Sequence, residues 1–357
     1  MHLQENVPLA PLTTFLIGGA ARFFVEAKSR NEVKAAVDFA QAGNLPLFVL
    51  GGGSNLVVSD AGWPGLVLKI AITGIERQPA EVDGKVVFDV GAGESWDDFV
   101  AVAVAANCGG VECLSGIPGS VGGTPVQNVG AYGQEVSDTV ESVEVFDRKE
   151  GQVHELCREA CGFAYRSSIF NTTERGRFII LRVTYGLIPG AAPHLAYADL
   201  KRHFDGRTTA PTLPETREAV RQIRARKGML IVEGDPDCRS AGSFFKNPVL
   251  SEEAHAELNK RAAAKGLTVP SYPALEKNKK VSAAWLVEHS GFTRGYTLGQ
   301  AGISSKHALA LINRGGATSA DILALKDQIQ SRVRETWGVR LEPEPVFVGT
   351  KGLGVRG

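Results

Sequence analysis

Two glycine-rich passages constrain the fold of this chain more than any other feature. The first, residues 51–55, reads GGGSN and follows the apolar run LPLFVL; the second, residues 114–133, reads LSGIPGSVGGTPVQNVGAYG. So many glycines and prolines cannot continue a regular helix or strand, and the apolar residues among them argue against a disordered linker. We therefore expect two ordered loops that let a ligand approach the backbone closely.

Neither loop matches the common nucleotide-binding motifs. The first lacks the Lys-Ser/Thr ending of a P-loop. It does not open a helix as a dinucleotide fingerprint does, because Gly62 and Pro64 interrupt the chain soon afterwards. Consecutive glycines can nevertheless direct several N–H groups into one concavity that suits an anion such as a diphosphate. The alternative is an elaborate loop with a purely structural role.

Helix and strand signals alternate over the first two thirds of the chain. Capping residues predict the starts of three helices, at Ser29, Ser95 and Thr212. The expected helices cover residues 30–42, about 95–106, and 212–228, and strands are expected over residues 140–145 and 177–185. The last turns of the third helix carry four basic residues, Arg221, Arg224, Arg226 and Lys227. These side chains either face water near the helix C-terminus or include one that meets a diphosphate.

Length, charge and hydropathy narrow the class of protein. A chain of 357 residues suggests two or three domains. Its formal net charge of zero gives no overall field for a polyanion, so we expect no nucleic-acid partner. The first residues lack a basic segment followed by an apolar core, and no apolar run reaches the roughly 18 residues of a membrane span. We expect no membrane insertion and a cytoplasmic location.

Metal-ligating residues do not form a recognisable set. The five cysteines are Cys108, Cys113, Cys157, Cys161 and Cys238, and no close histidine cluster completes a zinc site among them. His194, His203, His255, His289 and His307 show neither metal-ligand spacing nor a serine–histidine–acid arrangement. Each is expected to face solvent or to be satisfied in a core. We predict no metal site.

The stretch SAGSFFKNP, residues 240–248, reads as a strand. Pro248 disfavours the α region for Asn247 and pushes it towards an extended conformation. On a period of two, Ser243, Phe245 and Asn247 share one face, so two hydrogen-bonding groups flank an aromatic surface. The alternative is a half-buried strand whose serine satisfies a neighbouring carbonyl.

Six motifs in this order carry a resemblance that covers nearly the whole chain. They are LTTFLIGGAARFFVEA, VLGGGSNLVVSD, SGIPGSVGGTPVQNVGAYG, YRSSIF, SAGSFFKNP and VRLEPEP. Together they resemble the UDP-N-acetylenolpyruvoylglucosamine reductase (MurB) family of flavoenzymes, in the subclass with an extra tyrosine loop. The resemblance implies an α+β chain with an FAD-binding fold of the vanillyl-alcohol-oxidase/PCMH type in two subdomains, plus a C-terminal α+β subdomain that binds substrate.

The same resemblance implies the domain limits and the reaction. The first FAD-binding subdomain would be residues 1–72, completed by residues 338–357; the second would be 73–226, and the substrate-binding subdomain 227–337. The activity would be NADPH-dependent, FAD-mediated reduction of the enolpyruvyl group of UDP-N-acetylglucosamine enolpyruvate to UDP-N-acetylmuramate, in peptidoglycan precursor synthesis. The chain would be a monomer or a weak oligomer.

Site residues follow from the same comparison. Arg166, Ser243 and Glu344 fall on the catalytic positions of the family. The implied FAD contacts are Gly51, Gly52, Gly53, Ser54, Asn55, Ser115, Gly116, Gly119, Gly122, Gly123 and Asn128. The implied substrate contacts are Tyr197, Lys227, Asn247 and Tyr272. Read without the motifs, Arg166 could be a surface arginine, Glu344 a solvated acid and Tyr197 a core residue.

The chemistry accounts for the three catalytic residue types. Hydride addition to the vinyl carbon leaves negative charge over the neighbouring carbon and the carboxylate. Arg166 can pair with that carboxylate, and Glu344, if its proton is retained in a dry pocket, can donate to the enolate oxygen. Ser243 would deliver the proton to the carbanionic carbon. The chain departs from many relatives at Ser167, Pro345 and Val346, which puts contacts behind these residues in doubt.

Two other functions remain open on the sequence. One is another FAD-dependent oxidase on the same scaffold, although no histidine for covalent flavin attachment lies in either glycine-rich loop. The other is a non-catalytic flavoprotein that only binds a nucleotide sugar.

Overall fold

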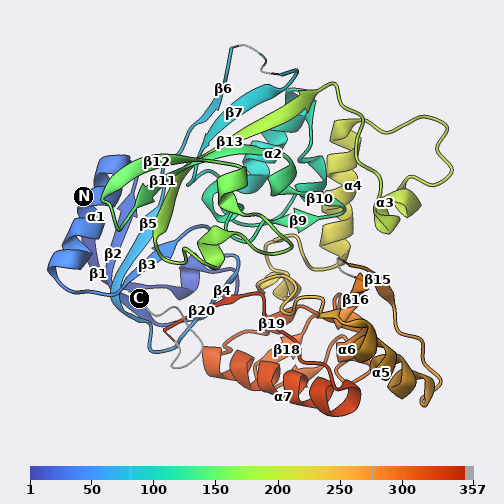
Figure 1. Ribbon diagram of the computed structural model, residues 1–357. Coiled ribbons are helices and arrows are strands. Elements are labelled where there is room, and N and C mark those ends of the chain that lie inside the picture. Colours follow the sequence, from blue (N-terminus) through green and yellow to red (C-terminus); the bar gives the residue numbers. More distant parts are fainter. Residues whose placement is uncertain (80, 82, 275–276, 350–357) are drawn as a thin grey trace.

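A four-stranded sheet forms the N-terminal part of the molecule (Figure 1). The structure is a computed structural model that describes residues 1–79, 81, 83–274 and 277–349. In spatial order the strands are β1 (Leu3–Pro8), β2 (Ala20–Ala27), β5 (Trp63–Ile70) and β3 (Leu47–Leu50). β1 pairs antiparallel to β2, and β2, β5 and β3 pair parallel. Helix α1 (Arg30–Ala42) connects β2 to β3 and begins as predicted, because the Glu32 N–H donates to the Ser29 hydroxyl.

A second, larger sheet carries the middle of the chain. Its order is β12-β11-β13-β7-β6, with β8 added beside β13. The bounds are β6 Ile75–Arg77, β7 Val86–Gly91, β8 Cys108–Gly109, β11 Val140–Asp147, β12 Gln152–Cys157 and β13 Phe178–Pro189. Helices α2 (Trp96–Ala105) and α4 (Leu213–Arg226) confirm the other two helix predictions. Trp96, Phe99 and Tyr185 stack together in the buried core of this part, which fixes α2 against the sheet.

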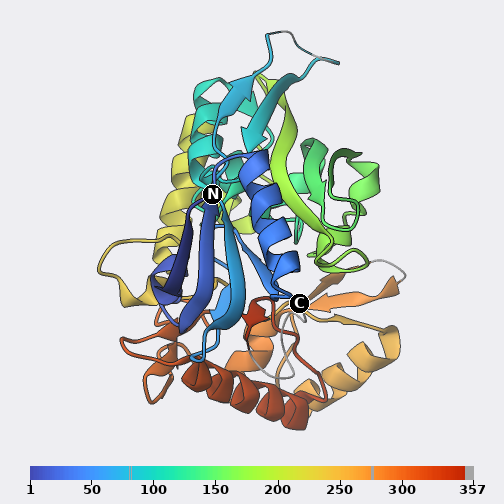
Figure 2. The same ribbon diagram turned by 90° about the vertical axis from the view of Figure 1, so that its left-hand side faces the viewer.

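The C-terminal third lies below both sheets, coloured orange to red in Figure 2. Its helices are α5 (Glu252–Ala263), α6 (Ala283–Glu288) and α7 (Ser319–Trp337). Two small sheets accompany them, one of β14 (Val249–Leu250), β16 (Lys279–Val281) and β15 (Ser271–Pro273), the other of β17 (Thr297–Leu298), β18 (Ala301–Ile303) and β19 (Leu311–Asn313). The apolar face of α7 supplies much of the core here.

The C-terminal segment returns to the first part of the fold. Strand β20 (Val346–Val348) pairs parallel with β4 (Leu56–Val58), directly after the first glycine-rich loop. The amide of Asn55 donates to the Glu344 carbonyl at 3.3 Å, so the start of β4 and the approach to β20 are tied together. This is the return that the resemblance implied, although residues 350–357 of the predicted segment lie outside the described residues.

The predicted domain limits at residues 72 and 226 stay predictions. One buried apolar cluster runs from Val25 on β2 to Leu213 at the start of α4, so it crosses the first limit without a break. A second cluster joins Phe15 and Val57 to the C-terminal third. None of the helices in the described part of the chain is both long and apolar enough to cross a lipid bilayer.

The strand prediction for residues 240–248 is wrong. The segment forms a single isolated bridge, between Phe245 and Pro343, and Phe244 and Phe245 are both fully buried. The Phe244 N–H donates to the Leu309 carbonyl, whereas the Lys246 N–H donates to the Glu342 carbonyl. The segment therefore runs between two other parts of the chain, and two consecutive phenylalanines are buried, which defeats the expected alternation.

Candidate active site

A cavity of about 1690 Å³ opens where the two sheets and the C-terminal third meet. Both glycine-rich loops line it, together with residues near Arg166, the end of α4, the 241–247 segment and the approach to β20. Segments that lie more than 200 residues apart in sequence thus form one site. Its size suits a dinucleotide and a second ligand better than a single small molecule.

The two glycine-rich loops touch through backbone. A Cβ atom on Gly52 would lie 2.5 Å from the Gly119 Cα atom, and one on Gly53, whose φ is +66°, would lie 1.8 Å from the Leu12 carbonyl oxygen. Side chains are therefore excluded at these positions. Among the described residues, no acceptor serves the N–H groups of Gly52, Gly53 and Ser54, and the buried Ser120 hydroxyl also has no partner. Free donors around a tight cradle fit the diphosphate of FAD.

The structure divides the predicted FAD contacts into two groups. Those on the cavity wall are Gly51, Gly52, Gly53, Ser54, Asn55, Gly119, Gly122 and Gly123. Ser115, Gly116 and Asn128 do not line the cavity, and their role as FAD contacts stays a prediction. The Ser115 hydroxyl donates to the Glu112 carbonyl, the Gly116 N–H donates to the Asp97 carboxylate, and the Asn128 amide donates to Glu135. The polar groups of these three residues make hydrogen bonds within the protein, and these bonds shape the loop.

Arg166 projects into the cavity from a strained turn. Its φ is 55°, in the left-handed region that few non-glycine residues adopt. Its Nη2 donates to the Gly130 carbonyl at 2.8 Å, and its Nε lies 3.2 Å from Glu344 Oε1. The Nε–H has no well-aligned acceptor within the described ranges, so this contact is an ion pair and not a hydrogen bond. Such strain held by surrounding structure is typical of functional sites.

Glu344 reaches the same place from the approach to β20. Its N–H donates to the Phe244 carbonyl at 2.9 Å, so its backbone is tied to the segment that carries Ser243. Burial raises the pKa of the Glu344 carboxyl, and the nearby charges of Arg166 and Lys246 oppose this effect only in part. The carboxyl group therefore keeps its proton to a higher pH than an exposed glutamate does.

Ser243 lines the cavity and has a histidine neighbour. Its Oγ lies 3.5 Å from His307 Nε2, a long hydrogen bond. Burial lowers the pKa of His307 to about 4, and the charges of Lys227 and Arg294 add to this. His307 is thus a neutral imidazole at physiological pH. The sequence showed no pattern that pointed to His307, since the two residues lie 64 positions apart.

Of the four predicted substrate residues, three line the cavity and one does not. Tyr197, Lys227 and Asn247 line the cavity. The Asn247 side-chain oxygen accepts the Ala283 N–H at 2.9 Å, which fixes the orientation of its amide. Tyr272 on β15 is 60 % exposed and is not on the cavity wall, so the structure does not bring it to the site.

Other residues of the site were missed or left undecided by the sequence. Arg224 is buried, and it donates to the Gly116 and Met229 carbonyls, so for this residue the solvent-facing alternative is wrong. Lys280 on β16 lines the cavity and places its Nζ 4.0 Å from the centre of the Tyr165 ring. That cation–π contact links the C-terminal third to the turn that carries Arg166.

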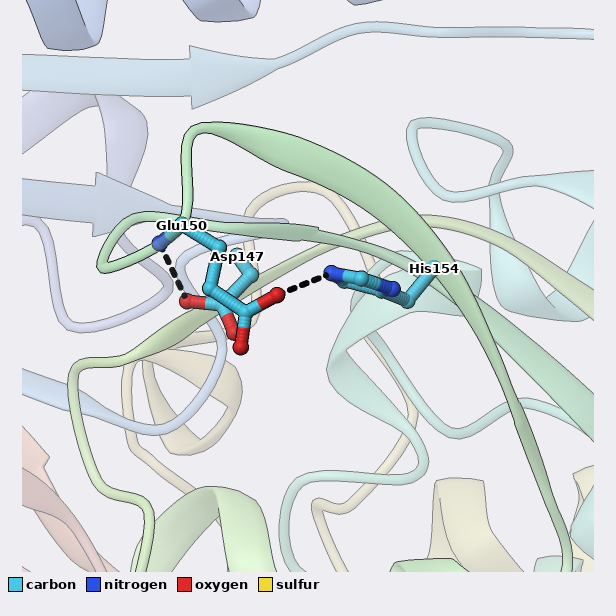
Figure 3. A group of neighbouring side chains, drawn as sticks. All are labelled: Asp147, Glu150 and His154. Carbon is cyan, nitrogen blue, oxygen red and sulfur yellow. Dashed lines mark hydrogen bonds and ion pairs between the residues drawn. The ribbon is translucent and has the colours of Figure 1, made fainter.

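A separate group of Asp147, Glu150 and His154 could offer three ligand atoms to a metal (Figure 3). His154 Nε2 lies 3.0 Å from Glu150 Oε2. However, the Arg177 guanidinium contacts both carboxylates, at 2.6 Å for Asp147 and 3.2 Å for Glu150, and holds the pKa of Asp147 below its usual value. A cation therefore already occupies the group, and the arrangement is that of an ion-pair network.

Comparisons with known proteins find relatives that match nearly the whole chain. A family model for the C-terminal domain of UDP-N-acetylenolpyruvoylglucosamine reductase matches residues 235–348, and a model for an FAD binding domain matches residues 21–156. Reductases of that name from Thermobifida fusca and Streptomyces coelicolor are 45% and 46% identical over 352 residues, which cover 97% of this chain and 98% and 90% of theirs.

A solved structure gives the same result. UDP-N-acetylenolpyruvylglucosamine reductase (MurB) from Thermus caldophilus has 30% sequence identity and a TM-score of 0.63, and the match covers 97% of this chain and 100% of that one. The expected α+β architecture with an FAD-binding fold is confirmed.

Proposed function

The chain belongs to the UDP-N-acetylenolpyruvoylglucosamine reductase family, and from this premise we propose which of its residues perform the reaction. It is an FAD-containing oxidoreductase that reduces UDP-N-acetylenolpyruvoylglucosamine in peptidoglycan synthesis. We propose that NADPH is the hydride donor, that the protein acts in the cytoplasm as a monomer or weak oligomer, and that Arg166, Ser243 and Glu344 are the catalytic residues.

One observation carries the assignment of roles. An arginine, a serine and a buried carboxyl from three distant segments line one cavity next to a glycine cradle. The Arg166–Glu344 ion pair and the Glu344–Phe244 backbone bond connect these segments physically. A surface arginine or a solvated glutamate would not have this placement, which supports the catalytic interpretation of both.

FAD, which the cradle of Gly52, Gly53 and Ser54 would hold, would supply the hydride chemistry of the reaction. Arg166 pairs with the substrate carboxylate and stabilises the negative charge that develops there. Burial raises the pKa of Glu344, and in its protonated form this residue donates a hydrogen bond to the enolate oxygen. Ser243 Oγ gives its proton to the carbon next to the carboxylate, and neutral His307 orients the Ser243 hydroxyl. Addition of one hydride and one proton completes the lactyl ether.

The rest of the cavity would bind the other groups of the ligands. Gly52, Gly53, Ser54 and Ser120 offer donors to the FAD diphosphate. Lys227 and Asn247 would bind the diphosphate of the substrate, and Tyr197 lies beside Lys227 at the cavity rim. Tyr272 remains a proposed substrate contact only if its strand moves, because in this structure it faces solvent.

An absorption spectrum of the purified protein tests the proposal. We expect a yellow protein that bleaches when NADPH is added without oxygen and recolours when UDP-N-acetylglucosamine enolpyruvate follows. A flavoprotein that only binds a nucleotide sugar would not recolour with the substrate. An oxidase on the same scaffold would recolour with oxygen at a physiological rate and would not need the enolpyruvyl compound.

Replacing Glu344 by glutamine tests the role of its proton. Because burial raises the Glu344 pKa, activity of the wild-type enzyme should be present below that pKa and should fall as the pH rises through it. The amide has no proton to lose, so kcat/KM of the variant should not fall at alkaline pH. Its value should be about 10- to 100-fold lower than that of the wild type. The measurement is kcat/KM against pH. An unchanged alkaline limb would assign the titration to another group.

A further inference from the structure

Lys227 is held by a carboxylate that does not line the cavity. Its Nζ lies 2.5 Å from Asp199 Oδ2, across 28 positions of sequence. Lys227 follows the last turn of α4, whereas Asp199 is in the first turn of helix α3 (Ala198–His203). The ammonium group also lies 5.8 Å from the centre of the Tyr132 ring.

Helix α3 packs against α4, and Tyr197 and Asp199 both lie at the start of α3. Leu200 is fully buried and packs in a cluster with Val220 and Ile223 of α4. Tyr197 precedes the first residue of α3 and meets Tyr132 edge to face, with ring centres 5.2 Å apart. The position of the Tyr197 ring and the direction of the Lys227 ammonium are therefore set by the same contact between two helices.

Asp199 counteracts the effect of burial on the Lys227 ammonium. The titratable groups near its ammonium are Asp199 in α3, Tyr197 directly before α3, Tyr132 from the second glycine-rich loop and His307 from the 304–310 segment. Burial lowers the pKa of Lys227, but its hydrogen bond to Asp199 and the nearby tyrosines raise it above the ordinary value overall. Asp199 is the carboxylate among these groups, and it opposes the effect of burial directly.

We propose that Asp199 is a positioning residue for nucleotide binding: through its ion pair it aims the Lys227 ammonium at the diphosphate of the ligand and holds Tyr197 at the cavity rim. An ammonium group has three N–H donors. One donor can stay on Asp199 while another binds a phosphate oxygen, so the ligand need not displace the carboxylate. The inference rests on the proposed function, in which this cavity takes a diphosphate.

The test is titration of the FAD-loaded enzyme with UDP, for the wild type and for Asp199→Asn. We expect the Kd for UDP to rise about 10-fold, because the variant loses the charge-assisted contact between residue 199 and Lys227 that positions the ammonium. KM for the enolpyruvyl substrate should rise likewise while kcat changes less than twofold, because Asp199 does not touch the reacting atoms. Affinity should also be lost at a lower pH than in the wild type, since only the nearby tyrosines then oppose the lowering of the Lys227 pKa by burial.

Three variants separate the explanations. Asp199→Glu should recover part of the affinity, and Asp205→Asn, an exposed acid just after the same helix, should leave it unchanged. UDP affinity that is equal or tighter in Asp199→Asn would overturn the inference, as would weaker binding with an unshifted pH dependence, which indicates a structural role. If Lys227→Met binds UDP as well as the wild type, the diphosphate site itself is wrong and the proposed substrate placement fails with it.

Discussion

Replacing Ser243 by alanine is expected to slow reoxidation of the reduced enzyme by the enolpyruvyl substrate by about 10²- to 10⁴-fold, the range for loss of a positioned proton donor. The hydroxyl lies on the cavity wall with His307 Nε2 at 3.5 Å. Reduction by NADPH needs no proton from this serine, so that half-reaction should stay within a few-fold of the wild type. Stopped-flow absorbance of the flavin measures both steps separately.

The matched control is Ser167→Ala, next to Arg166. Ser167 exchanges backbone hydrogen bonds with Ala164, but its hydroxyl makes no hydrogen bond to any described residue, so removing the hydroxyl should leave both half-reactions nearly unchanged. Equal loss of both half-reactions in Ser243→Ala would contradict the role of Ser243, because it would indicate damage to FAD binding and not to proton transfer.

Gly53→Ala is expected to abolish FAD retention and to lower the free energy of unfolding by several kcal/mol. The new Cβ would lie 1.8 Å from the Leu12 carbonyl oxygen, a backbone atom that cannot yield without moving the first part of the fold. The φ of +66° adds strain of roughly 1 kcal/mol for any residue with a Cβ. The ratio of absorbance at 450 nm to that at 280 nm, chosen because FAD absorbs near 450 nm, and the denaturant midpoint measure the two effects.

Gly151→Ala separates backbone strain from crowding. Gly151 has a similar φ of +70°, but a Cβ there meets nothing within 4 Å. This variant should lose only about 1 kcal/mol and should keep its FAD. If Gly53→Ala behaved in the same way as Gly151→Ala, the close approach of Gly53 to the Leu12 backbone would not be what shapes the cradle.

Local sequence patterns determined where three helices of this protein begin and where its glycine cradle lies. Capping residues placed the starts of α1, α2 and α4, because a cap depends on side chains and N–H groups only three residues apart. The glycine runs placed the cradle, since only glycine tolerates the close backbone contacts found at Gly52 and Gly53. The order of motifs along the chain was enough to indicate the family, and it predicted the three catalytic positions that we propose.

Tertiary structure alone decided how those positions are supported. The pairs Ser243–His307 and Lys227–Asp199 join segments 64 and 28 residues apart. No local pattern encodes which histidine lies beside the serine or which acid lies beside the lysine. The same holds for Phe244 and Phe245, both buried because two other segments cover the chain there, and for Asn128, whose side-chain amide donates to Glu135 and to the Ala164 carbonyl. Contacts of this kind depend on where packing of the core places distant segments, and a pattern of neighbouring residues does not carry that information.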